Sequence, residues 1–274
     1  MRGLDKLVCN LPKRSSNSHK GTYGKVLNIA GSKYMPGAAY LSSVSALKIG
    51  CGYCFLLSED SVINSVESQT QNVVFVPIRD MKNQLSSASV LSIGCGLSTS
   101  RKAKKIFKSA LKFVGDIPVV IDADGLNILS VSNIKLPKHL VLTPHPMEAA
   151  RLLNVSLDEI LNDIEGSAKE ISKKYNCVVA LKSHRTVVCN ENEVYINLTG
   201  NSALAKAGSG DVLTGVIAGL LAQGMEPFEA TKLGVYVHGL AGELASKKLT
   251  EYGVMASDLV SFLSNALYEI SQRS

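Results

Sequence analysis

The chain has 274 residues, of which 46% are hydrophobic, and its formal net charge is +6. This composition is ordinary for one large globular domain or two small ones. The positive charge does not indicate a nucleic-acid partner, because the densest basic run, Arg101–Lys105, leads into the apolar residues of an amphipathic helix. The surplus is better suited to attracting an anionic small molecule.

Membrane and secretory classes are also excluded at this level. No segment approaches about 18 uncharged apolar residues, the length of a membrane span. The first residues, Met1–Asp5, lack the apolar run of a secretory signal. Six cysteines are scattered through apolar stretches and do not resemble a disulfide framework: Cys9, Cys51, Cys54, Cys95, Cys177 and Cys189. We therefore expect a reduced, cytoplasmic protein with no membrane partner.

Short apolar runs typical of buried strands occur throughout the first two thirds of the chain. In chain order they are Val26–Ala30, Tyr53–Leu57, Val73–Val76, Val90–Ile93, Val119–Ile121, Val141–Thr143, Val178–Leu181, Thr186–Cys189 and Val194–Asn197. The last two flank a polar Asn-Glu-Asn-Glu turn, which predicts a hairpin.

Helical spacing of apolar residues separates many of these runs and then dominates the end of the chain. The predicted helices are Gly37–Ile49, Arg101–Val114, Pro146–Leu153, Leu157–Tyr175, Gly210–Gln223, Pro227–Lys247 and Met255–Ser271. Strands that alternate with helices indicate a largely parallel sheet covered on both faces. No linker or repeat divides the sequence, so we expect one α/β domain over residues 1–274.

Five of the predicted strands end in glycines or polar residues, at the edge where open parallel sheets bind ligands. These ends are Gly31-Ser32, Gly94-Cys95-Gly96, Asp122-Ala123-Asp124, Thr143-Pro144-His145-Pro146 and Lys182-Ser183-His184-Arg185-Thr186. Each has a plain structural alternative when taken singly: turn glycines, a helix-capping Asp122, or an exposed turn histidine at His145. Together they predict a binding site.

The segment Gly208-Ser209-Gly210-Asp211 delivers the chain into a helix. Glycines allow backbone N–H groups to approach a ligand closely, and the helix start adds a positive dipole end, so the turn predicts an anion hole for phosphate. Asp211 either caps the helix or acts as a general base that takes a proton from an attacking hydroxyl.

Several motifs in this order resemble those of the ADP/ATP-dependent NAD(P)H-hydrate dehydratases, which have the three-layer ribokinase-like α/β fold. The resemblance runs from about His19 to Ser257. Its motifs are His19–Gly24, Gly31-Ser32 with Met35–Ala39, Asp122–Asp124, Leu142–Pro146 with Glu148, Asn201–Gly215 and Val237–Ala241. The set is specific, whereas Gly-x-Gly-Asp alone is shared with many sugar and vitamin-precursor kinases.

The resemblance implies repair of NADH and NADPH hydrates (S epimer): phosphorylation of the hydrate hydroxyl by ADP or ATP, then loss of phosphate. It implies Asp211 as the catalytic base and Gly208, Ser209 and Gly210 as the anion hole. It also places the hydrate near Ala38, Gly96, His145 and Asp211, and the nucleotide near Gly210 and along Lys182, Ser183, His184, Arg185 and Thr186. A Mg²⁺ cofactor, a homo-oligomer (a tetramer) and an epimerase on a separate protein are further expectations.

Four positions depart from the family pattern. Ser183 and Ala207 stand where many members have glycine, Cys95 where proline is common, and Met147 where glycine is common. Ser183 is the departure that bears on function, because a side chain there can crowd the nucleotide or require a different backbone angle.

Some alternatives stay open at this point. Asp122 and Asp124 either hold Mg²⁺ through water or shape the pocket. We interpret the Cys51-x-x-Cys54 pair as structural cysteines and His238 as a packed or capping histidine. Two other functions compete with the dehydratase: a ribokinase-like kinase of a vitamin precursor or small alcohol, and a noncatalytic nucleotide-sensing module.

Overall fold

The computed structural model describes residues 11–272, so Met1–Asp5 and Cys9 lie outside the described residues. Its centre is a nine-stranded sheet in the order β3-β2-β1-β4-β5-β6-β7-β8-β9. The strands are β1 Lys25–Ile29, β2 Tyr53–Ser58, β3 Val74–Pro77, β4 Val90–Ile93, β5 Val119–Ile121, β6 Leu140–Leu142, β7 Val178–Leu181, β8 Val187–Cys189 and β9 Val194–Ile196. All nine predicted strands are confirmed.

Strands β1 to β7 pair in parallel, and β8 and β9 add an antiparallel hairpin at one edge. The chain moves outward from β1 to β3 and then returns to place β4 on the other side of β1. This reversal creates a switch point between β1 and β4, where the carboxyl ends of open α/β sheets leave a crevice. The Gly31 N–H donates to the Cys95 carbonyl oxygen across it (2.8 Å).

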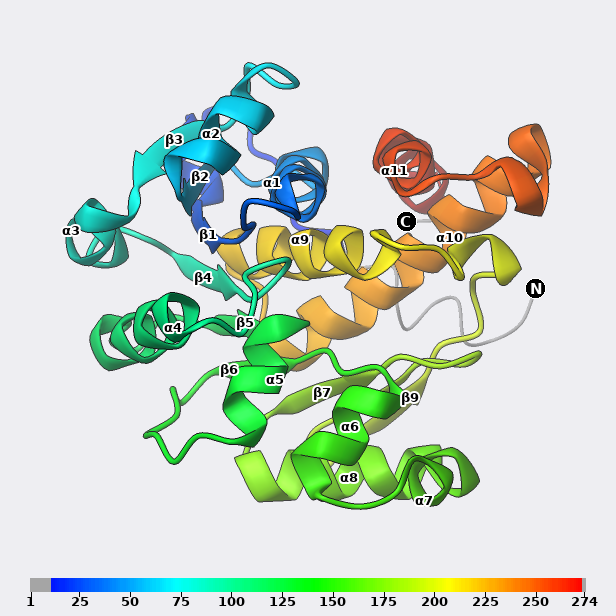
Figure 1. Ribbon diagram of the computed structural model, residues 1–274. Coiled ribbons are helices and arrows are strands. Elements are labelled where there is room, and N and C mark those ends of the chain that lie inside the picture. The colour runs from blue at the N-terminus through cyan, green and yellow to red at the C-terminus, as the bar shows by residue number, and fades with distance from the viewer. Residues whose placement is uncertain (1–10, 273–274) are drawn as a thin grey trace.

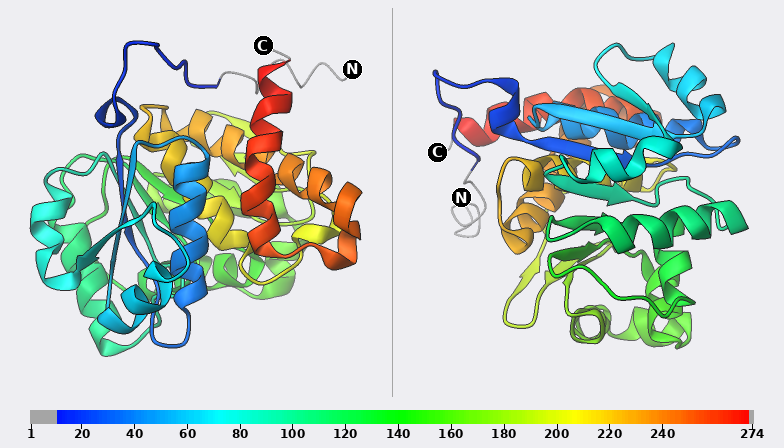
Figure 2. Two further views of the ribbon diagram at one scale, coloured as in Figure 1. Left: turned by 90° about the horizontal axis from the view of Figure 1, so that it is seen from above. Right: turned by 90° about the vertical axis from the view of Figure 1, so that its left-hand side faces the viewer.

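Helices cover both faces of the sheet and give three layers (Figure 1; Figure 2). The helices are α1 Pro36–Lys48, α2 Asp60–Glu67, α3 Met81–Leu85, α4 Arg101–Phe113, α5 Asp124–Ser130, α6 Pro146–Leu153, α7 Leu157–Asn162, α8 Ile164–Tyr175, α9 Ser209–Ala222, α10 Pro227–Gly253 and α11 Ala256–Ser271. One face carries α1, α9, α10 and α11, and the other carries α4, α5, α6 and α8. This is the expected α/β class.

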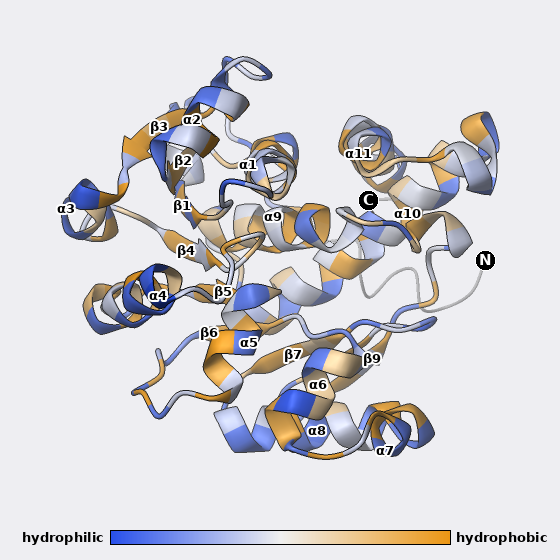
Figure 3. Ribbon diagram, in the orientation of Figure 1, coloured by the Kyte–Doolittle hydropathy of each residue, from blue (hydrophilic) through white to orange (hydrophobic). Residues whose placement is uncertain are grey.

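The core follows the alternation of side chains along the strands. Val26 joins the cluster under α9 and α10, whereas its neighbour Leu27 joins the cluster under α4. Both side chains are buried, as expected for strands covered on both faces. Figure 3 shows that strands such as β6 and β7 are largely hydrophobic, whereas α4 and α8 carry both hydrophilic and hydrophobic residues.

Helices α1 and α9 pack with their backbones close together. A Cβ atom on Gly215 would lie only 2.1 Å from the Ser42 carbonyl oxygen, and one on Gly219 would lie 2.2 Å from the Ile49 side chain. The small residues of α9 therefore permit this close packing.

Three helical predictions need correction. The stretch 157–175 is two helices, because the Asp163 side chain accepts a hydrogen bond from the Gly166 N–H and starts α8 after α7 has ended. Helix α10 reaches Gly253 instead of ending at Lys247, with a kink at Thr250 (φ 61°, ψ 161°). The short helices α2, α3 and α5 were not predicted.

Two sequence expectations concern features of the whole chain. Among residues 11–272, no helix combines the length and the apolar character needed to cross a membrane. Cys51, Cys54, Cys95, Cys177 and Cys189 are buried free thiols, so the Cys51-x-x-Cys54 pair belongs to the packing of the core.

Candidate functional site

The Gly208–Asp211 turn begins α9 at the carboxyl edge of the sheet. Gly208 is the N-cap and has φ 90° and ψ −16°, a left-handed conformation that favours glycine. The N–H groups of Gly210 and Asp211 have no hydrogen-bond acceptor within the described part of the chain, as expected for the first turn of a helix. Two donors and the positive end of α9 therefore face outward together, which suits an anion.

Ser209 differs from its two neighbours in this turn. Its N–H donates to the Lys206 carbonyl oxygen (3.2 Å), and its Oγ lies 3.1 Å from the His238 Nε2. The side chain is only 6% exposed. Ser209 thus has its polar groups engaged inside the protein, and the outward donors are those of Gly210 and Asp211.

A buried carboxylate joins three elements beneath the turn. Asp122, at the end of β5, is 1% exposed and accepts hydrogen bonds from Lys182 Nζ (2.8 Å) and Thr214 Oγ1 (2.6 Å). Lys182 follows β7, and Thr214 lies on α9 one turn after Gly210. Because both Asp122 oxygens are occupied, this residue fixes the lysine and the helix relative to each other.

The Lys182 ammonium lies beside the anion-binding turn. A Cβ atom on Gly210 would lie 3.4 Å from Lys182 Nζ. Burial alone would lower the pKa of Lys182, but the Asp122 and Glu148 carboxylates outweigh burial and raise the pKa above its ordinary value. The group is therefore a fixed positive charge next to the free N–H groups.

Asp211 lies in the first turn of α9 on the same edge. Burial, and then the charge of Asp122, raise the pKa of Asp211 to about 6, although the Cys95 thiol and the Lys182 ammonium act in the opposite direction. A carboxylate with a pKa near the working pH is suited to accept a proton as a general base.

Of the four residues expected near the hydrate, Ala38, Gly96 and Asp211 gather around the end of β4, whereas His145 lies at the start of α6. A Cβ atom on Gly96 would lie 2.8 Å from the Ala38 Cβ, and Gly96 has φ 60°. The negative charge of Asp211 contributes to raising the pKa of the buried Cys95 thiol, after burial itself. The ends of β1 and β4 and the first turns of α1 and α9 therefore lie against one another at the carboxyl ends of the strands.

Backbone strain marks the strand end between the two carboxylates. Ala123 has φ 49° and ψ −121°, which is unusual for a residue with a side chain. Asp122 on one side of it bonds to α9, while Asp124 on the other side accepts the Ser98 N–H (2.7 Å). The strained backbone at Ala123 lets the two neighbouring carboxylates point toward different segments, Asp122 toward α9 and Asp124 toward the Ser98 loop.

His145 is the N-cap of α6 and combines capping with exposure to the site. Its Nδ1 accepts hydrogen bonds from the N–H groups of Met147 (3.1 Å) and Glu148 (3.3 Å). Its Nε2 lies 3.2 Å from Glu148 Oε1. His145 thus caps α6 through Nδ1 and places Nε2 beside the Glu148 carboxylate.

A cavity of about 1020 Å³ opens next to the anion-binding turn. The lining residues come from the strand ends, the segment before α9, α9 and α10: His145, Lys182, Ser183, His184, Thr186, Asn197, Thr199, Gly200, Asn201, Ser202, Leu204, Ala205, Lys206, Ala207, Ser209, Gly210, Leu213, Val235, His238 and Gly239. Five of the six residues expected to hold the nucleotide line it. Arg185, the sixth, is exposed and does not line this cavity.

Ser183 fits its place without strain. It is not among the residues with positive φ, so its backbone does not need glycine. Its Oγ donates to the Arg185 carbonyl oxygen (2.8 Å), which stabilises the turn between β7 and β8.

The described residues do not form a magnesium site of their own. No group of three or more His, Cys, Asp or Glu side chains within residues 11–272 is arranged to hold a metal. Both carboxylate oxygens of Asp122 accept hydrogen bonds, from Lys182 and Thr214, and Asp124 accepts one from the Ser98 N–H. A Mg²⁺ ion held directly by these carboxylates does not fit the site.

Sequence reasoning missed Thr214 and the loop 197–206, and it treated His238 as a packed or capping histidine. Thr214 is a polar residue on an otherwise apolar helix, four positions after Gly210, and that spacing was the available signal. His238 is packed, with 7% exposure, but it also lines the cavity.

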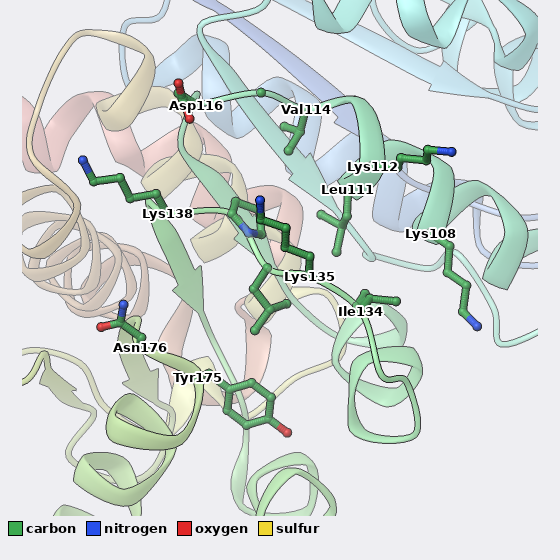
Figure 4. A pocket seen from close by; sticks show the side chains of 13 residues that line it. Lys108, Leu111, Lys112, Val114, Asp116, Ile134, Lys135, Lys138, Tyr175 and Asn176 are labelled. Atoms are coloured by element: carbon green, nitrogen blue, oxygen red, sulfur yellow. The ribbon is translucent and has the colours of Figure 1, made fainter.

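A second cavity, of about 880 Å³, lies at the amino ends of β5, β6 and β7, opposite the carboxyl ends that carry the candidate site. Lysines surround it: Lys108, Lys112, Lys135 and Lys138. In Figure 4, Lys138 extends to one side, and Lys108 and Lys112 extend to the other. No residue predicted for the site lines this cavity.

Comparisons with known proteins agree with this geometry. The family model described as NAD(P)H-hydrate dehydratase matches residues 26–265. An ADP-dependent (S)-NAD(P)H-hydrate dehydratase from Neisseria meningitidis is 38% identical over 84% of this chain and 80% of its own length. Several curated relatives are bifunctional NAD(P)H-hydrate repair enzymes, and the chain spans about half their length.

Solved structures support the same assignment. An ADP/ATP-dependent NAD(P)H-hydrate dehydratase from Bacillus subtilis, co-crystallized with ATP/Mg²⁺, matches with a TM-score of 0.89 and 31% identity over 97% of both chains. A ribokinase-like superfamily protein from Enterococcus faecalis matches with a TM-score of 0.90 and 26% identity over 97% of this chain and 94% of the other. The fold is ribokinase-like, and the chain belongs to the NAD(P)H-hydrate dehydratase family.

Proposed function

We propose that the protein is an ADP- or ATP-dependent (S)-NAD(P)H-hydrate dehydratase that returns damaged NADH and NADPH to use. The observation that carries this proposal is the first turn of α9. Within the described residues, this turn has two N–H groups without an acceptor next to the Lys182 ammonium, and it carries the Asp211 carboxylate, which contacts Cys95 beside Gly96. A phosphate donor and a hydroxyl acceptor can therefore meet at one turn.

The nucleotide belongs in the cavity next to Gly210. Its lining, which includes Lys182–His184, Thr186 and most of the segment 197–207, offers polar backbone and side-chain groups, and its volume of about 1020 Å³ suits a ligand of nucleotide size. The terminal phosphate then lies against the N–H groups of Gly210 and Asp211, and Lys182 balances part of its charge. A Mg²⁺ ion would be held mainly by the nucleotide phosphates, whose charge it would help to balance, because no group of three or more His, Cys, Asp or Glu side chains within residues 11–272 is arranged to hold a metal.

The hydrate belongs on the Ala38, Gly96 and Asp211 side. Asp211 removes the proton from the hydrate hydroxyl, and that oxygen attacks the terminal phosphorus while the bond to the leaving nucleotide breaks. With ADP as donor, AMP leaves. Phosphate is a better leaving group than hydroxide, so it departs from the phosphorylated ring, and loss of a ring proton restores the double bond.

The test is direct. Purified protein is incubated with NADH hydrate, Mg²⁺ and either ADP or ATP, and recovery of NADH absorbance is followed. The proposal requires nucleotide-dependent recovery. A kinase of a small alcohol would consume nucleotide only with its own alcohol, and a sensing module would bind nucleotide without turnover.

Assembly and location belong to the same proposal. We expect a homo-oligomer, a tetramer by family resemblance, in the cytoplasm. Size-exclusion chromatography with light scattering tests the first expectation.

A further inference from the structure

His238 is the one histidine buried next to the anion-binding turn. It lies in α10 with 7% exposure, among the apolar and small residues Val237, Gly239 and Leu240. Its Nε2 lies 3.1 Å from the Ser209 Oγ, which belongs to the first turn of α9. This contact joins two helices at the edge of the nucleotide cavity.

The imidazole is neutral at physiological pH. Burial lowers the pKa of His238 to about 4, against the opposing effect of a hydrogen bond with the Ser209 backbone. The positive charge of Lys182 lowers the pKa further. A neutral imidazole has one donor and one acceptor nitrogen, so it can bond a hydroxyl in the core without burying a charge.

The turn that Ser209 belongs to needs such an anchor. Gly208 and Gly210 flank Ser209, and glycines lose the most conformational freedom when a chain segment becomes ordered. Ser209 supplies the only side chain between them. Its N–H is bonded to the Lys206 carbonyl oxygen and its hydroxyl to His238, so this residue is held from two directions.

The consequence falls on the residues that follow. Gly210 and Asp211 carry the free N–H groups, and their direction depends on how the preceding residue is fixed. We infer that His238 is a positioning residue that holds Ser209 and thereby aims the Gly210 and Asp211 N–H groups at the nucleotide phosphate. The inference rests on the proposed function in taking ADP or ATP as the ligand.

The test compares Ser209→Ala, His238→Leu, their double variant and His238→Gln. ADP binding is measured by calorimetry, and KM is measured for ADP and for the hydrate. Each single variant should raise the ADP dissociation constant about tenfold, as expected when a buried hydrogen bond that orders a site is lost. The double variant should lose no more than His238→Leu, because both changes break the same contact. His238→Gln should recover part of the affinity.

Ser172→Ala is the matched control. Ser172 is also a buried serine whose hydroxyl makes one hydrogen bond, to the Cys177 carbonyl oxygen (2.7 Å), but it lies in the last turn of α8, near the amino end of β7. It should lower melting temperature while leaving ADP binding unchanged. If Ser209→Ala and His238→Leu behave like this control, or if their losses add in the double variant, the positioning role is wrong.

Failure of the proposed function has a different signature. If the wild-type protein binds ADP but restores no NADH, only the proposed dehydratase function is contradicted. The ADP-binding measurements on the variants would still decide the role of His238. Wild-type protein that repairs the hydrate without binding ADP or ATP would overturn both.

Discussion

Two cavities of similar size lie at opposite edges of the sheet, with volumes of about 1020 and 880 Å³. At the carboxyl edge, Lys182 is held by the buried Asp122 and lies beside unpaired N–H groups. At the amino edge, the lysines Lys108, Lys112, Lys135 and Lys138 form no ion pair with any carboxylate of residues 11–272, and they diverge (Figure 4). Size and positive charge alone do not identify a site; convergence of fixed polar groups does.

The largest expected effect is on Asp211. Asp211→Asn keeps the size of the side chain and some capping ability but cannot accept the proton. We expect kcat to fall by about 10²–10⁴-fold, the usual contribution of a general base, with hydrate binding and melting near normal. Loss of a helix cap alone would instead lower stability by about 1 kcal/mol and leave kcat almost unchanged. A well-folded variant with surviving kcat would contradict the mechanism.

Gly210→Val tests the anion hole next. The Cβ would lie 3.4 Å from Lys182 Nζ, so further branching presses on the lysine and on the space before the free N–H groups. We expect nucleotide-dependent turnover to fall at least about tenfold, equivalent to ~1.4 kcal/mol, in a protein that stays folded. A folded variant with a near-normal rate on ADP would show that the turn does not bind phosphate.

Variants of Thr186 and Arg185 test whether the nucleotide lies inside this cavity. Thr186 lines it, whereas Arg185 is exposed and does not. Thr186→Ala should raise KM for ADP by about two- to tenfold, as for one lost hydrogen bond, and change KM for the hydrate less. Arg185→Ala should have the smaller effect on KM for ADP. The reverse order would place the nucleotide outside the cavity.

The raised pKa of Asp211 has consequences for pH. Activity should fall on the acid side as the carboxylate is protonated, with a limb near pH 6. For stability the sign is opposite: the folded pKa is above the ordinary 3.8, so the contribution of Asp211 is fully present below pH 3.8 and is lost as pH rises through 6. The melting temperature of Asp211→Asn relative to wild type should therefore rise between pH 4 and pH 8. A flat difference would mean that the carboxylate is not shifted.

The smallest effect should come from the amino-edge cavity. Lys135→Glu and Lys138→Glu should change kcat/KM by less than about twofold and stability by no more than about 0.5 kcal/mol, as for exposed charges away from a site. A large loss of activity in either variant would break the contrast between the two edges.

The strands could be predicted from the sequence because each is a short apolar run bounded by polar or turn residues. Strands that are buried on both faces of a sheet have this continuous apolar pattern. Helix boundaries were less readable. Apolar spacing continues through Ile160, Ile164 and Ile171, and it hides the break that the Asp163 cap introduces. Helix α5 begins at Asp124, inside a segment that the sequence marks only by its carboxylates.

The site was predictable as a set of strand ends but not as a network. Asp122 is 60 residues from Lys182 and 92 from Thr214, and no periodicity encodes contacts over such separations. For the same reason the sequence could not show that the Ser209 side chain contacts His238 of α10. Only the fold brings these residues together.

The glycines of α9 also set the tolerance of the catalytic geometry. Helix α1 carries Ala38 and α9 carries Asp211, and the two helices meet backbone to backbone at Gly215, where a Cβ would lie 2.1 Å from the Ser42 carbonyl oxygen. The distance between Ala38 and Asp211 is thus set by main-chain contacts between the two helices, and main-chain atoms cannot relax by changing rotamer. A methyl group added at Gly215 would push the two helices apart. A displacement of about 1 Å between the reacting groups can slow a reaction about 10²-fold. The position of the proposed base Asp211 therefore depends on Gly215, one helical turn further along α9.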